Sequence, residues 1–103
     1  MNLTNDKVFS FIGLATRARK LVSGEFSTEK AIKEKKAKIV IIATDASENT
    51  KKKFRNSCLF YQLEYFEYGT KEELGQCMGK EARASLAVLD EGMANEIIKY
   101  LKR

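Results

Sequence analysis

The chain has 103 residues, 44% of them apolar, and a formal net charge of +5 from 19 basic and 14 acidic side chains. This length suits one domain with its own core, and the apolar content is too high for a disordered chain. With no histidine and only two cysteines, the chain lacks the commonest general base, and neither a zinc site nor a disulfide framework is expected.

The basic residues are concentrated in the first half of the chain. Residues 1–55 contain 13 basic and 6 acidic side chains, so they carry +7, whereas the remaining residues carry −2. A polyanion such as RNA would therefore meet the first half. Residues 1–6 lack a signal-sequence pattern, and no apolar run approaches the roughly 20 residues that span a bilayer, so we expect a cytoplasmic protein with no membrane partner.

A helix is predicted over residues 4–22 from apolar residues at three- and four-residue spacing. Thr4 or Asn5 can cap its start, and Ser23 and Gly24 would end it.

A second helix is predicted over residues 26–35, with Ser27 or Thr28 as its cap. A short strand near residues 22–26 is an alternative for the connection. Residues 38–43 form a β-branched run without polar alternation, which predicts a strand buried on both faces.

The next helix is predicted over residues 48–62, capped by Asp45 or Ser47, and residues 63–68 read as a strand. The helix has a basic outer face, and its predicted inner face consists of Phe54, Cys58, Leu59 and Tyr61.

Thr70 followed by Glu73 fits a capping box, which starts a short helix that ends near Met78. A third strand is predicted over residues 84–89 and a terminal helix over residues 93–101. Helices and strands alternate after a leading helix pair. We therefore predict an α/β fold, a single-domain three-layer α-β-α sandwich with a small mixed sheet, over residues 1–103.

Catalysis and nucleotide-cofactor binding are disfavoured by the motifs. Neither glycine-rich phosphate-binding pattern is present, and Gly75 and Gly79 bracket a short helix. The adjacent acidic pairs point apart on a regular element, so they are solvated charges and not an acid/base pair. We expect no enzyme activity, no cofactor and no metal site.

The region around Gly24 is the main candidate for binding. Gly24 can adopt a positive φ, and the helix that follows offers unpaired N–H groups suited to a phosphate or an RNA edge. Basic residues flank it on both sides and are candidates for phosphate contacts: Arg17, Arg19, Lys20, Lys30 and Lys33. An ordinary connection between two helices is the alternative interpretation.

Three stretches of the sequence resemble the kink-turn RNA-binding ribosomal protein family, the archaeal "seven-Ae" and eukaryotic "thirty-e" type, and within it the bacterial YlxQ-like branch. They are Gly24 with Lys30 six residues later, residues 37–45, and residues 73–88. The resemblance implies an α-β-α sandwich that binds RNA without catalysis, and we expect it to act as a monomer.

The resemblance also implies which residues contact a kink-turn or similarly bent, possibly ribosomal, RNA. The first surface is the loop and start of the second helix, where Glu25, Phe26 and Ser27 join Gly24 and Lys30. The second surface is a loop before the last strand, and Thr44 and Asp45 lie alongside. That second surface consists of Met78, Gly79, Lys80, Glu81, Ala82 and Arg83.

One departure from the family lies inside the first surface. The family has asparagine and glutamate two and three residues after the glycine, where this chain has Phe26 and Ser27. The alternative function is therefore a protein-interaction module on the same fold that has lost standard kink-turn readout. A small α/β enzyme or ligand-binding domain is a further alternative, which the missing histidine and glycine loops disfavour.

Overall fold

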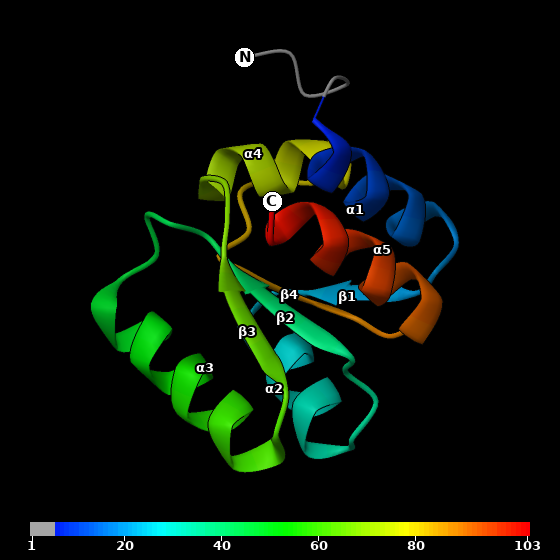
Figure 1. Cartoon of the computed structure of the whole chain (residues 1–103). Helices are drawn as coiled ribbons and strands as arrows, with labels where there is room; N and C mark the ends of the chain where they lie inside the picture. Colours follow the sequence, from blue (N-terminus) through cyan, green and yellow to red (C-terminus); the bar gives the residue numbers. More distant parts are fainter. Residues whose placement is uncertain (1–5) are drawn as a thin grey trace.

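The structure is a computed structural model that describes residues 6–103. This part of the chain forms five helices and four strands (Figure 1). In chain order these are α1 (Lys7–Arg17), β1 (Leu21–Ser23), α2 (Glu25–Lys33), β2 (Ile39–Ile42), α3 (Glu48–Tyr61), β3 (Glu64–Glu67), α4 (Lys71–Cys77), β4 (Ser85–Val88) and α5 (Glu91–Leu101).

The four strands form one mixed sheet in the order β1-β4-β2-β3. Strand β2 runs parallel to β3, whereas β4 is antiparallel to both β1 and β2. Helices α1, α4 and α5 cover one face of the sheet, and α2 and α3 cover the other (Figure 1). The predicted three-layer α-β-α sandwich with a mixed sheet is confirmed.

The two central strands form the middle of the core. Every residue of β2 and β4 is buried, because helices cover both faces of the sheet. Phe9 of α1 and Phe54 of α3 are also buried, and their two helices cover opposite faces of the sheet (Figure 1). The absence of polar alternation in β2 therefore reflects burial on both faces, as predicted.

The prediction of one helix over residues 4–22 was wrong at its C-terminal end. Helix α1 ends at Arg17, and Arg19 adopts a left-handed conformation with φ of 60°. Strand β1 follows because its backbone pairs with β4, with Val22 opposite Ala87. The alternative strand near residues 22–26 is thus confirmed in its first residues.

Most helix caps follow the predicted chemistry, but α2 does not. The predicted caps Thr4 and Asn5 lie outside the described residues; the Asp6 side chain accepts from the Phe9 N–H at 3.0 Å and caps α1. Ser47 caps α3, and Thr70 with Glu73 forms the predicted capping box of α4. Helix α2 begins instead at Glu25 with Gly24 as its cap residue, so neither Ser27 nor Thr28 caps it.

The inner face of α3 is narrower than predicted. Phe54 and Cys58 are buried, Tyr61 is half-buried, and Leu59 is 79% exposed, so the prediction for Leu59 was wrong. The reason is geometric: Leu59 follows Cys58 by about 100° around the helix, which turns its side chain toward solvent. None of the helices within residues 6–103 is both long and apolar enough to cross a bilayer.

Candidate nucleic-acid interface

The start of helix α2 is fixed in position and open to solvent. Gly24 has φ of 92° and ψ of 158°, a conformation that is almost restricted to glycine. Its N–H donates to the Ser85 carbonyl at 2.9 Å, which ties the end of β1 to the start of β4. Within residues 6–103 no side chain caps the helix, and a Cβ at Gly24 would meet nothing within 4 Å. The first N–H groups of α2 are therefore available to a ligand.

The loop between α4 and β4 lies directly beside this helix start. The Arg83 Nε donates to the Ser23 Oγ at 3.2 Å, across 60 residues of sequence. The Arg83 guanidinium also donates to the carbonyls of Glu81 and Ala82 within its own loop. This contact places the two surfaces implied by the family resemblance side by side, so that they form one continuous surface.

The other residues of this loop differ in how much of each is exposed to solvent. Gly79, Lys80, Glu81 and Ala82 are exposed, whereas the Met78 side chain is only 6% exposed and belongs to the core. Met78 therefore serves packing at the end of α4 and offers little surface to a ligand.

The loop at Thr44 and Asp45 lies alongside. The Lys71 N–H donates to the Asp45 carboxylate at 2.8 Å, and the Lys71 carbonyl accepts from the Arg83 N–H at 3.0 Å. Thr44 donates to the Gly69 carbonyl at 3.0 Å. Lys71 therefore connects the Thr44–Asp45 loop to the Arg83 loop.

The basic residues predicted to contact phosphates do not all lie on one part of the surface. The Arg17 guanidinium and the Cys77 carbonyl both lie against Gly13, so Arg17 is close to the end of α4 where the Arg83 loop begins. Arg19 and Lys20 lie at the opposite end of β1 from Gly24, because the Lys20 carbonyl accepts from the Leu89 N–H beyond the end of β4. Arg17 is thus closer to the joined loops than Arg19 and Lys20 are.

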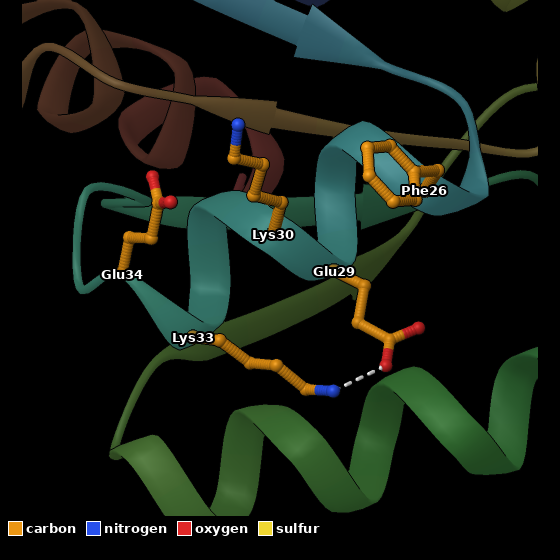
Figure 2. Close-up of a pocket in the computed structure, with 5 residues that line it drawn as sticks. All are labelled: Phe26, Glu29, Lys30, Lys33 and Glu34. Atoms are coloured by element: carbon orange, nitrogen blue, oxygen red, sulfur yellow. Dashed lines mark ion pairs between the residues drawn. The ribbon is translucent and has the colours of Figure 1, made fainter.

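Lys33 is already paired with a carboxylate. Glu29 bonds to Lys33 at 2.8 Å and to Lys53 of α3 at 2.6 Å, and Lys53 also reaches Glu25 at 3.4 Å. The hydrogen bonds from Lys33 and Lys53 lower the pKa of the Glu29 carboxyl to about 2. Figure 2 shows Glu29 and Lys33 on the side of α2 that faces α3, with Lys30 pointing away from it. Within residues 6–103, Lys30 is exposed and has no acidic partner.

The basic outer face of α3 is largely neutralised by similar pairs. Lys51 and Arg55 both lie 3.5 Å from the Glu67 carboxylate, and Lys53 is paired with α2. Of the run at residues 51–53, Lys52 alone has no acidic partner in the described part of the chain. These ion pairs leave the α3 face less attractive to a polyanion than its sequence suggests.

Glu29→Gln is expected to remove a pH-dependent part of the stability. The folded pKa of Glu29, about 2, lies below its ordinary value of 4.5. The ionised carboxylate therefore stabilises the fold above pH 4.5, and this contribution is lost as the pH falls toward 2. At pH 7 the variant should unfold at a urea concentration lower by about 0.5 M, and the difference from wild type should shrink at pH 3.

A matched control for this prediction is Glu48→Gln. The Glu48 side chain is 87% exposed and lies 3.9 Å from Lys51, so Glu48→Gln should lower the urea midpoint by much less, through its first-turn position in α3 alone. Equal midpoints for Glu29→Gln and Glu48→Gln at pH 7 would contradict the prediction.

Residues 6–98 match the sequence profile of the Ribosomal protein L7Ae/L30e/S12e/Gadd45 family. The chain belongs to this family.

Two relatives within the family resemble the chain over most of its length. A Bacillus subtilis (strain 168) protein named RNA-binding protein YlxQ is 45% identical over 93 residues, 90% of this chain and 93% of its own. An Enterococcus faecium protein of the same name is 43% identical over 90 residues, covering 87% of this chain and 86% of its own.

Solved structures show the same family fold. A protein of unknown function from Bacillus halodurans superposes with a TM-score of 0.93 at 33% identity, over 96% of this chain and 100% of its own. The Giardia lamblia 15.5kD RNA binding protein superposes with a TM-score of 0.79, over 99% of this chain and 87% of its own. Its identity is 17%, so it supports the fold alone.

Two residues beside the candidate site make contacts that were not predicted from the sequence. Ser23 holds the Arg83 side chain, and Glu29 pairs α2 with α3. For Glu29 the spacing of four residues to Lys33 was a visible signal, whereas nothing local indicates that Ser23 meets Arg83.

Proposed function

We propose that this family member is a non-enzymatic RNA-binding protein that recognises a kink-turn or similarly bent RNA. The observation that carries the proposal is the Arg83–Ser23 hydrogen bond, which joins the Gly24 loop and the Arg83 loop into one surface. The names of the relatives at 45% and 43% identity support an RNA partner. We further propose that it acts as a monomer in the cytoplasm.

In this proposal the two loops contact different parts of the RNA. The open N–H groups at the start of α2 face the groove edges of the bent RNA, because donors at a helix start suit electron-rich base edges and phosphates. Lys30, exposed on α2, contacts a phosphate. The exposed loop of residues 79–82 packs against unstacked bases of the bulge.

The proposal predicts that Lys30→Ala weakens binding of a kink-turn RNA by about tenfold, because a charge-assisted contact to phosphate is lost. Fluorescence anisotropy with a labelled kink-turn RNA at fixed salt measures the affinity. Lys52→Ala is the matched control, because Lys52 is an exposed helical lysine without an acidic partner in the described chain, and it lies on α3.

Two outcomes would contradict the proposal. One is wild-type affinity in Lys30→Ala, and the other is equal binding of the kink-turn RNA and of a straight duplex of the same composition. A tightly bound protein that survives nuclease treatment, together with no RNA affinity, would favour the protein-interaction alternative.

A further inference from the structure

Phe26 is a large apolar side chain left in solvent within the proposed RNA surface. Its exposed fraction is 79%, although it lies in the first turn of α2. No other aromatic ring in residues 6–103 stacks on it. The side chain therefore contributes little to the core, and its position requires another explanation.

The ring lies on the side of α2 that carries Lys30. Residues 26, 30 and 34 are four apart, so they form one stripe along the helix. Figure 2 shows Phe26, Lys30 and Glu34 on the side of α2 away from α3. The stripe therefore presents an aromatic ring, then an ammonium group without an acidic partner in the described chain, then a carboxylate that is paired with Lys36 at 3.4 Å.

Phe26 and Lys30 also border two open hollows on the surface. One has a volume of about 450 Å³ and extends along α2 to Glu34 (Figure 2). The other has a volume of about 280 Å³ and reaches Val22 of β1 and Leu89 after β4. A planar group could thus lie against the Phe26 ring with its charged substituent near Lys30.

A nucleotide has the matching chemistry. A base offers a flat aromatic face, and its phosphate offers a negative charge within the reach of a lysine one helical turn away. Every base can stack on an aromatic side chain, and such contacts contribute to binding without requiring one base identity. The excess of basic residues in this half of the chain favours a polyanion over a protein segment.

We propose that Phe26 stacks on an unpaired nucleobase of the bound RNA while Lys30 contacts a phosphate of the same or the adjacent nucleotide. The inference rests on the proposed function and deepens it. At the position where the family has an asparagine that can form hydrogen bonds, this chain has a stacking surface. Recognition there depends on the base being unpaired more than on which base it is.

The test separates stacking from simple apolar burial. Phe26→Leu keeps an apolar side chain and removes the ring, whereas Phe26→Tyr keeps the ring. The probe is a kink-turn RNA with 2-aminopurine at each unpaired position in turn. We expect Phe26→Leu to lose about tenfold in affinity and to lose the 2-aminopurine quenching at one position, and Phe26→Tyr to retain both.

Phe60→Leu is the matched control, because Phe60 is an aromatic residue that is 78% exposed on α3. It should bind the RNA as wild type does. Wild-type affinity and quenching in Phe26→Leu, while Lys30→Ala still weakens binding, would overturn the stacking inference and leave the proposed function intact. Failure of the wild-type protein to bind the kink-turn RNA would overturn both.

Discussion

Gly75→Ala is expected to destabilise the protein by about 3 kcal/mol, even though alanine is the better helix former. Gly75 is buried in α4, and the loop before β4 passes directly over it. An added Cβ would lie 2.6 Å from the Glu81 carbonyl carbon and 3.0 Å from the Ala82 Cα. Because both atoms are backbone, the loop must move for the methyl group to fit.

The displaced loop is also the one that Arg83 ties to Ser23. We therefore expect Gly75→Ala to bind kink-turn RNA more weakly at temperatures where it remains folded. Urea denaturation measures the change in unfolding free energy, and anisotropy measures the affinity.

Gly92→Ala is a suitable control for the Gly75 substitution. Its added Cβ would meet one atom within 4 Å, the Asp90 Oδ2 at 3.3 Å, so this helical glycine is not overlaid by backbone. It should change stability by less than about 1 kcal/mol. An unfolding midpoint for Gly75→Ala equal to that of wild type would contradict the prediction, because it would show that the loop can move without loss of unfolding free energy.

Raising the salt concentration from about 50 to about 200 mM is expected to weaken RNA binding by about 30- to 300-fold. The estimate assumes that three to five cations each neutralise a phosphate. The candidates are exposed basic residues that have no acidic partner within residues 6–103: Arg17, Lys30 and Lys80 beside the joined loops, and Arg19 and Lys20 at the opposite end of β1.

The ion pairs of the structure predict which lysines contribute to this salt dependence. Lys30→Gln should reduce the slope of log affinity against log salt by about one. Lys33→Gln should change it much less, because Glu29 already holds Lys33 at 2.8 Å. A slope that responds equally to both substitutions, or an affinity insensitive to salt, would argue against the assignment of phosphate contacts.

The elements that could be predicted from sequence are those whose burial leaves a local pattern. Strand β2 consists of four buried β-branched residues, and the Thr70–Glu73 capping box needs residues three apart. Strand β1 left no such pattern, because Val22 continues the apolar spacing of α1. Its conformation depends on pairing with Ala87, a partner far along the chain.

In the candidate site, too, the residues with a local pattern could be predicted, whereas the contacts between distant segments could not. Gly24 and Lys30 could be found from turn and helix chemistry and from the resemblance to the family. The hydrogen bond from Arg83 to Ser23 and the ion pair of Glu29 with Lys53 depend on tertiary packing, so neither has a local signature. Exposure of Phe26 likewise required knowing where α2 begins.

The order of the strands also has a consequence for the timing of folding. Strand β1 and Gly24 are synthesised before their hydrogen-bonding partners, Ser85 to Val88 of β4, which lie far along the chain. During vectorial synthesis the backbone groups of β1 stay unpaired until β4 has been made. Pairing between strands so far apart in the sequence is intrinsically slow. A nascent chain that lacks β4 cannot position the Gly24 loop, so the proposed RNA surface is assembled only after β4 has been made.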